Sequence, residues 1–207
     1  MDFIEVKKYD LPDFQILSEQ EYPDFRYFIW KPDRYYLILG SSNKAETSLI
    51  VENVLNDQIP VYKRPSGGES VLLGPDTLVL STLIHTQKLE DPPKHFHDCN
   101  IRIMNALTEM GVKNISQKGI SDIAIGNKKI AGSSIYRKTN IVFYHAVLNV
   151  AESPEKLEKY LAMPSKQPDY RQNRPHHEFV TSLKAEGYDF GEQFPLILGR
   201  MLNHSAP

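Results

Sequence analysis

Residues 63–71 combine groups that suit the binding of an anion. They read KRPSGGESV, with a basic pair, a hydroxyl group and two adjacent glycines. Glycine lets a backbone come close to a ligand and adopt conformations that a Cβ forbids. Exposed amide N–H groups beside Lys63 and Arg64 favour phosphate or carboxylate. The alternative interpretation is an ordinary hairpin turn, because glycine pairs mark turns in many proteins.

A second stretch whose residues could take part in catalysis or binding lies at 121–134, which read SDIAIGNKKIAGSS. It brings together a carboxylate (Asp122), a Gly-Asn turn, a lysine (Lys129) and a glycine that allows close packing (Gly132). A histidine, His145, follows in the next apolar run. Each side chain also has an ordinary interpretation: Lys129 as a solvated hairpin lysine, Asp122 as an acceptor of backbone N–H bonds, and His145 as a satisfied histidine within a sheet.

The elements that would position these residues are mostly strands. Alternating or β-branched runs predict strands at 3–9, 26–30, 35–39, 59–62, 77–86, 122–125, 128–137 and 141–150. Helical patterns occupy 13–21, 45–56, 96–110, 153–162 and 190–203, and residues 163–175 read as an irregular surface segment. Because strands outnumber helices and come in neighbouring runs, we expect an α+β fold with a mixed, largely antiparallel sheet and packed helices.

Composition narrows the class of protein. The chain has 207 residues, 41% of them hydrophobic, which is enough for one domain with a sizeable core. A net charge of −2 gives no reason to expect a nucleic-acid partner. No apolar run approaches the length of a membrane span, and one cysteine excludes an internal disulfide framework. We therefore expect a soluble protein of a reducing compartment, the cytoplasm.

His95, His97 and Cys99 raise the question of a metal site. Residues two apart on a helix point roughly 200° away from each other, so these three side chains cannot converge on one ion. Cys99 is more simply a core residue on the buried face of its helix.

The two stretches, taken with the run YHAVL at 144–148, resemble the lipoate–protein ligase family. That family has, in order, a basic-x-Ser-Gly-Gly loop, an Asn or Asp before a hairpin with a Gly-x-Lys motif, and a strand that begins with His. The run LILGSSN at 37–43 also looks like a segment of the family. The resemblance covers residues 27–183 and implies a biotin/lipoate protein ligase-like catalytic domain.

The resemblance also implies a reaction and its participants. Family members activate lipoate or octanoate with ATP and Mg²⁺ to an acyl-adenylate. They then transfer the acyl group to a lysine of a lipoyl domain on an acceptor protein. Positive charge and backbone donors suit this chemistry, because both reactants are anionic.

Site residues follow from the resemblance position by position. Lys129 matches the family lysine between acyl carbonyl and phosphate, and is the predicted catalytic residue. Substrate or adenylate binding is assigned to Arg64, Ser66, Gly67, Gly68, Asp122, Gly132 and His145. Asp122 is also the candidate Mg²⁺ ligand, and Arg64 either contacts the anion or fixes the loop. We expect strand residues such as Val71, Ile123 and Val147 to line an apolar slot for the acyl tail.

The sequence departs from the family pattern at several points. Glu69 stands where the family has a third glycine, and its carboxylate would repel phosphate unless it points away or meets Mg²⁺ or Lys63. The histidine that often follows the loop is Leu73 here. We expect residues 1–207 to form a single catalytic domain without the accessory domain of many ligases. A separate accessory subunit, or use of preformed adenylate, would compensate.

Two other functions compete with the ligase. Relatives of the same fold transfer octanoyl or lipoyl groups from a carrier protein with a cysteine nucleophile. Cys99 is the only cysteine and falls on a buried helix face, so this reading lacks its nucleophile. The other alternative is a non-catalytic protein that binds a lipoyl group or a partner.

Overall fold

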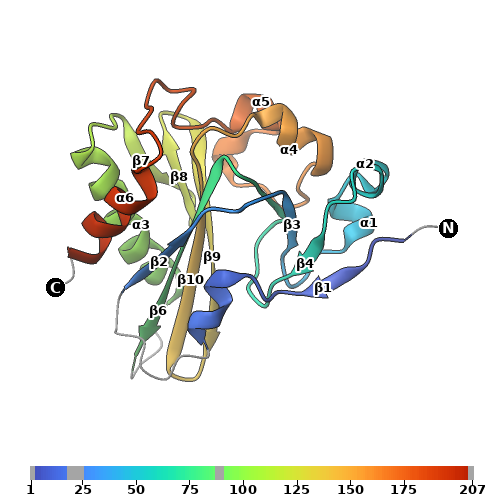
Figure 1. Ribbon diagram of the computed structural model, residues 1–207, viewed down its shortest axis with the longest axis horizontal. Helices are drawn as coiled ribbons and strands as arrows, with labels where there is room; N and C mark the ends of the chain where they lie inside the picture. The colour runs from blue at the N-terminus through green and yellow to red at the C-terminus, as the bar shows by residue number, and fades with distance from the viewer. Residues whose placement is uncertain (1–2, 18–25, 87–90, 205–207) are drawn as a thin grey trace.

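The computed structural model describes residues 3–17, 26–86 and 91–204, and it contains two sheets (Figure 1). The larger sheet has six strands, each antiparallel to its neighbours. In spatial order they are β2 (Tyr27–Trp30), β6 (Thr77–His85), β10 (Ile141–Asn149), β9 (Lys128–Lys138), β8 (Asp122–Ile125) and β7 (Ile115–Lys118). β6 and β10 are buried along most of their length, because both of their faces are covered.

The smaller sheet has four strands and mixed directions. Their spatial order is β1 (Val6–Lys8), β4 (Val61–Lys63), β3 (Tyr36–Leu39) and β5 (Val71–Leu73). β4 runs parallel to both neighbours, whereas β5 is antiparallel to β3. The two sheets together confirm the predicted α+β class with a mixed, largely antiparallel sheet.

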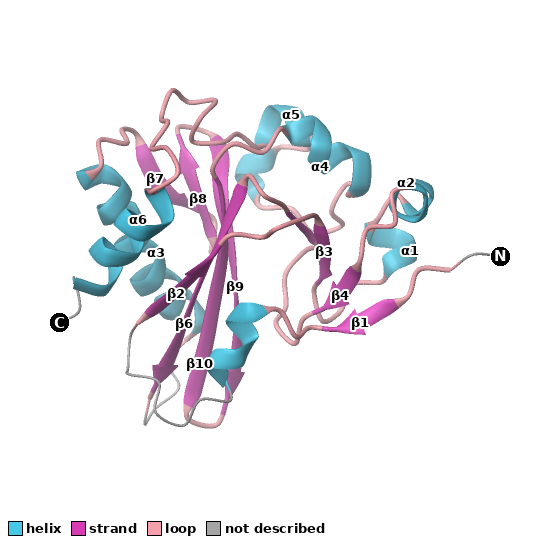
Figure 2. Cartoon of the chain, viewed as in Figure 1, coloured by secondary structure: helices cyan, strands magenta, loops and turns pink. Residues whose placement is uncertain are grey.

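Helices cover the sheets in two groups. The first group, α3 (Pro92–Glu109) and α6 (Phe194–His204), lies against one side of the larger sheet (Figure 2). The second group lies near the smaller sheet and comprises α1 (Ala45–Ser48), α2 (Val51–Asn56) and α4 (Pro154–Tyr160). A short helix, α5 (His176–Phe179), packs against α4 and β9. Two short 3₁₀ helices, η1 (Pro12–Leu17) and η2 (Asp169–Arg171), complete the described elements.

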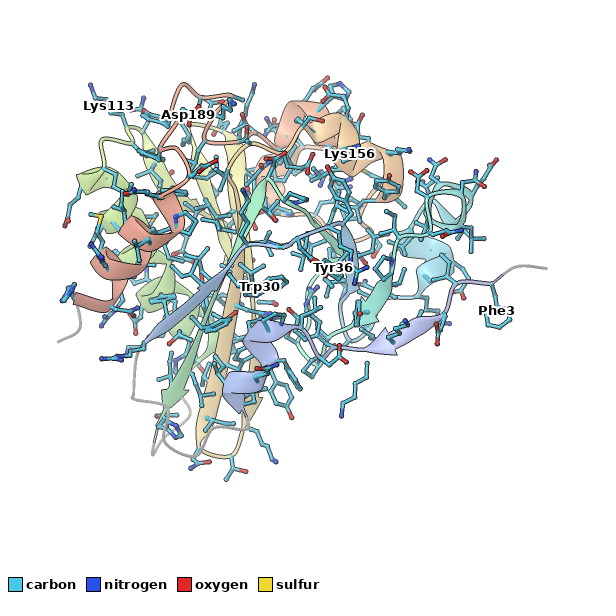
Figure 3. The ribbon with its side chains drawn as sticks, viewed as in Figure 1. Phe3, Trp30, Tyr36, Lys113, Lys156 and Asp189 are labelled. Atoms are coloured by element: carbon cyan, nitrogen blue, oxygen red, sulfur yellow. The ribbon has the colours of Figure 1, made fainter. Side chains whose placement is uncertain are left out.

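The main core lies between the larger sheet and α3. Cys99, Ile103 and Leu107 are fully buried on the face of α3 that the periodicity predicted. A second apolar cluster joins the two sheets, where Trp30 of β2 and Tyr36 of β3 lie in the middle of the molecule (Figure 3). Their ring centroids are 6.5 Å apart, nearly edge to face. This junction fixes how β5 and the loop before it sit against the larger sheet.

The predicted helix at 45–56 is wrong as a single element. The chain forms two short helices, α1 and α2, that are interrupted at Leu49 and Ile50. Leu49 makes a β-bridge with Leu161, and the Ile50 N–H donates to the Tyr160 carbonyl at 2.9 Å. The Leu49 N–H still donates to the Ala45 carbonyl, but the Ile50 N–H pairs with a distant segment, which local periodicity does not reveal.

Other boundaries also differ from expectation. The helix expected at 13–21 is the 3₁₀ helix η1, and residues 18–21 lie outside the described residues. Strand β7 was not predicted, because its sequence ISQK lacks apolar alternation. Segment 163–175 contains η2 and the buried Arg171, so it is not simply surface. Within the described residues, no helix combines the length and apolar character needed to cross a membrane.

Candidate active site

The hairpin of β8 and β9 places Lys129 beside Asp122. A bulge between Ile123 and Ala124 shifts the register, so that Asp122 lies opposite Gly132. The Lys129 Nζ is 2.8 Å from Asp122 Oδ1. A Cβ on Gly132 would lie 2.6 Å from that Nζ, so a larger residue would displace the lysine from this position. The glycine that the sequence marked for close packing thus makes space for the lysine.

Asp122 is buried and uses both carboxylate oxygens. Its Oδ2 accepts a hydrogen bond from the Tyr170 hydroxyl at 2.8 Å. Burial, followed by the charge of Asp122, raises the pKa of Tyr170, so the tyrosine stays protonated and donates. Asp122 therefore links the hairpin to segment 163–175, an element that the sequence did not associate with the site.

The glycine loop is held by Arg64. Its Nη2 donates to the carbonyls of Gly67 and Glu69, both at 2.8 Å, and its Nη1 donates to the Ile38 carbonyl. Burial lowers the pKa of this guanidinium to about 10. Gly68 has a φ of +88°, which favours glycine. Of the two roles expected for Arg64, these contacts correspond to fixing the loop.

His145 lies in a buried polar network. Its Nε2 is 2.6 Å from the Oγ atoms of both Ser66 and Ser134. Its Nδ1 is 3.7 Å from Asp13 Oδ2. Asp13 is completely buried and also accepts from the Tyr9 hydroxyl. The network ties the glycine loop, β9, β10 and η1 together at one point.

These groups surround a cavity of about 1190 Å³. The predicted residues Arg64, Gly68, Asp122, Lys129, Gly132 and His145 line it. Ser66 lies beneath the surface against His145, and Gly67 contributes its carbonyl to Arg64. For the apolar slot, Val71 and Val147 line the cavity, but Ile123 does not. Ile123 points into the main core, so its predicted side of the strand was wrong.

Glu69, which replaces the third glycine of the family pattern, is engaged with neighbouring loops. Its carboxylate accepts from the Asn43 side-chain amide at 3.4 Å and from the Lys166 backbone N–H at 3.1 Å. The Lys63 ammonium instead donates to the Asn43 carbonyl. Glu69 thus connects the glycine loop to segment 163–175 across the cavity through uncharged donors.

Several residues of this site could not be recognised from the sequence. They are Asp13, Ser134, Tyr170, Arg171 and His176, and apart from the buried Asp13 they line the cavity. Asp13 is the first residue of the helix predicted at 13–21, a position where aspartate is common as a cap. No spacing in the sequence relates these residues to the glycine loop or the hairpin, because the tertiary fold brings them together.

Cys99 does not supply a nucleophile. It is fully buried in the main core, and burial raises the pKa of its thiol to about 12. Transfer through a cysteine thioester therefore has no accessible thiolate here. Among the described residues, no cluster of three or more His, Cys, Asp or Glu side chains could hold a metal ion.

Two of the buried histidines, His145 and His176, predict that the free energy of unfolding falls on mild acidification. Burial lowers the pKa of His145, and burial with the Arg171 charge lowers that of His176. Below about pH 6.5 these histidines are protonated in the unfolded chain but remain neutral in the folded chain. The free energy of unfolding therefore decreases as the pH falls, until the pKa values of the folded state are reached. Urea denaturation between about pH 7.5 and 5.5 should show a slope of up to about 1.4 kcal/mol per pH unit for each histidine.

The matched control for this prediction is a pair of glutamine variants. His176→Gln should reduce the slope, whereas His204→Gln, at an exposed helix end, should leave it unchanged. Stability that is flat across this pH range would contradict the prediction.

The sequence model of one protein family, the lipoyl protein ligase A/B catalytic domain, matches residues 15–192 of this chain. The curated lipoate-protein ligase A of Psychrobacter cryohalolentis is 27% identical over 137 residues, which cover 65% of this chain and 38% of that protein. The alignment thus spans less than half the length of that relative.

Solved structures share the fold at low sequence identity. A bi-partite lipoate protein ligase of Thermoplasma acidophilum, studied with its E2 lipoyl domain, is 18% identical with a TM-score of 0.76, over 96% of this chain and 80% of that chain. A lipoate-protein ligase A bound with ATP is 19% identical with a TM-score of 0.75, over 96% and 82%.

Proposed function

Because the chain belongs to the lipoyl protein ligase A/B catalytic domain family, we propose that it is an ATP-dependent lipoate–protein ligase. It activates lipoate or octanoate to the acyl-adenylate and releases pyrophosphate. It then transfers the acyl group to a lysine of a lipoyl domain, forming an amide and releasing AMP.

The observation that carries this proposal is the position of Lys129. Its ammonium group is on the wall of the cavity, paired with Asp122, in the space that Gly132 leaves open. A carboxylate attacking a phosphate brings two anions together, and a preorganised cation is the group that lowers this barrier. The ion pair holds the ammonium in place before any ligand arrives.

Other residues of the site have supporting roles in this proposal. Gly68 offers backbone to the adenylate, and Arg64 keeps the loop in shape from beneath. His145 holds Ser66 and Ser134 by hydrogen bonds. Val71 and Val147 give the cavity apolar wall that suits an acyl tail.

Asp122 is the candidate ligand for Mg²⁺. Mg²⁺ commonly takes one or two carboxylates and completes its coordination with water and substrate phosphates. Asp122 provides one carboxylate, which Mg²⁺ arriving with the nucleotide would share with the Lys129 ammonium and the Tyr170 hydroxyl. When bound, the ion would neutralise phosphate charge.

The acceptor, domain organisation and location are part of the same proposal. We propose a lipoyl domain as the acceptor, which the name of the Thermoplasma relative supports. We also propose that residues 1–207 act as one catalytic domain in the cytoplasm. Adenylate formation either proceeds in this domain alone or requires an accessory subunit.

Mass spectrometry of the acceptor tests the function. The purified protein is incubated with ATP, Mg²⁺, lipoate and a lipoyl domain, and pyrophosphate release is measured in parallel. We expect pyrophosphate and one added lipoyl group per acceptor. Parallel reactions contain preformed lipoyl-adenylate, or an octanoyl thioester of a carrier protein without ATP.

The three reactions separate the alternatives. Transfer from lipoyl-adenylate but not from ATP and lipoate would mean that an accessory subunit is needed for activation. Transfer from the carrier thioester without ATP would overturn the ligase. Absence of transfer in all three would favour a binding protein.

A further inference from the structure

Arg171 carries a buried charge without an acidic partner. Only 4% of the residue is exposed, and in the described part of the chain no carboxylate forms an ion pair with it. Its Nε donates to the Arg174 carbonyl at 3.0 Å, and its Nη2 contacts the Met163 sulfur at 3.1 Å. Sulfur is a weak acceptor, so the guanidinium is poorly compensated. A buried charge normally requires pairing, because its desolvation is costly.

Arg174 is a contrasting arginine three residues further on. Both guanidinium groups lie over the Phe179 ring, at 4.6 Å for Arg171 and 5.3 Å for Arg174. The Arg174 nitrogens donate to backbone carbonyls of Tyr170, Arg171, Asn127 and Glu178. Arg174 is therefore satisfied by the fold. The Nη1 of Arg171 makes no hydrogen bond with the described residues and is not among their fully enclosed unpaired atoms.

Arg171 lines the same cavity as Lys129. The preceding residue, Tyr170, is hydrogen-bonded to Asp122, which holds Lys129. On the other side, α5 leads into Val180, which makes a β-bridge with Lys129. Burial lowers the pKa of Arg171, and the Asp122 charge opposes that effect without touching the guanidinium. An anion in the cavity would provide the partner that the fold does not.

The backbone after Arg171 is unusual. Gln172 and Asn173 have φ values of 51° and 58°, so two consecutive residues other than glycine adopt the left-handed conformation. Such residues carry a conformational cost that the surrounding structure must offset, and they concentrate at functional sites. The turn fixes Arg171 at the cavity wall.

We propose that Arg171 is an anion-binding residue that contacts phosphate oxygens of the nucleotide in the cavity that Lys129 also lines. This inference rests on the proposed function, since it requires a phosphate-bearing substrate. During activation the acyl carboxylate forms its bond to the α-phosphorus while the bond to the β-phosphate oxygen breaks. The negative charge then moves to pyrophosphate. The guanidinium hydrogen-bonds the phosphate oxygens and keeps its own protons.

Calorimetric binding of Mg²⁺-ATP, pyrophosphate and AMP tests the inference without any turnover. Arg171→Met keeps an apolar side chain against Phe179 and removes the charge. We expect it to weaken ATP binding by about 10- to 100-fold, since a hydrogen bond to a charged group is lost. Arg171→Lys keeps the charge but lacks the planar guanidinium, so its affinity for ATP should lie between those of the wild type and Arg171→Met. Arg200→Met, at an exposed position on α6, is the matched control and should bind as the wild type does.

The three ligands locate the contact. If the variant binds ATP and pyrophosphate more weakly but AMP as the wild type does, Arg171 contacts the pyrophosphate leaving group. Weaker binding of ATP and AMP places it at the α-phosphate. Arg171→Met with wild-type affinity for all three would overturn the inference, and if that variant does not fold, wild-type affinity in Arg171→Lys would do so.

The result for the wild-type protein separates the inference from the proposed function. If the wild type binds none of the three ligands, the nucleotide chemistry fails and the role of Arg171 fails with it. If the wild type binds and transfers while the Arg171 variants are unaffected, only the role of Arg171 is wrong.

Discussion

Replacing Lys129 by alanine should lower the rate of acyl-adenylate formation by roughly 10²- to 10³-fold, the size expected when one preorganised charged donor is removed. The lysine is the cation that the hairpin places at the cavity wall, held by Asp122. Pyrophosphate release with ATP, Mg²⁺ and lipoate measures the effect. Transfer from preformed lipoyl-adenylate should also fall, because the proposed function assigns the same ammonium to the junction of acyl carbonyl and phosphate.

The fold should survive this change. The Lys129 side chain is 30% exposed, so water can partly replace its ammonium beside Asp122 when the lysine is removed. Asp122 also keeps its hydrogen bond from Tyr170. A thermal melt close to that of the wild type would therefore accompany the loss of activity.

Lys128 is the matched control, since it is adjacent and exposed. Lys128→Ala should retain wild-type activity, and Lys129→Met, which keeps the length of the side chain, should behave like the alanine variant. Activity within a few-fold of the wild type in both Lys129 variants would remove the residue from catalysis. It would leave the family membership untouched.

The fold class was predictable because its signals are local. The strands β6, β9 and β10 and the helix α3 carry periodicity strong enough to locate them within a few residues. The helix at 45–56 failed because Leu49 pairs with Leu161, more than a hundred residues away. Strand β7 failed because it lies at the sheet edge and carries no apolar alternation.

The residues of the candidate site also differ in whether local sequence or the tertiary fold reveals them. Residues in contiguous motifs, such as Lys129 and the glycine loop, were singled out by residue type and assigned to the site by the resemblance to the family. Asp13 and Arg171 were not, because their meaning depends on burial. An aspartate after a proline resembles a helix cap until the fold places it beside His145, and an arginine in a polar segment resembles a surface residue until its partners are counted.

Asp13 should be among the most sensitive positions for stability. It is completely buried, and its carboxylate accepts from Tyr9 at 2.7 Å and from Ser81 at 2.9 Å. Asp13→Ala leaves these two hydroxyl groups and His145 without their acceptor. Removing one member of such a buried network costs about 3–5 kcal/mol. For a chain of this size, the lower figure corresponds to a decrease in Tm of roughly 6–12 °C.

Activity should decrease as well, because Asp13 orients the histidine that holds the glycine loop. With Nδ1 no longer facing a carboxylate, His145 can rotate and release Ser66. The effect is separated from unfolding by measuring transfer well below the lower Tm. Asp10→Ala, at an exposed position three residues earlier, is the control and should match the wild type in both measurements.

Asparagine at position 13 distinguishes the hydrogen bonds from the charge. Asp13→Asn keeps one oxygen acceptor but loses the negative charge beside His145. If the hydroxyl partners dominate, this variant should recover about half of the lost stability, because each hydrogen bond to a charged group contributes about 1.5–3 kcal/mol. If the charge dominates, it should be as unstable as the alanine variant. If the Asp13→Ala protein has the same Tm as the wild type, the carboxylate is not buried in this network.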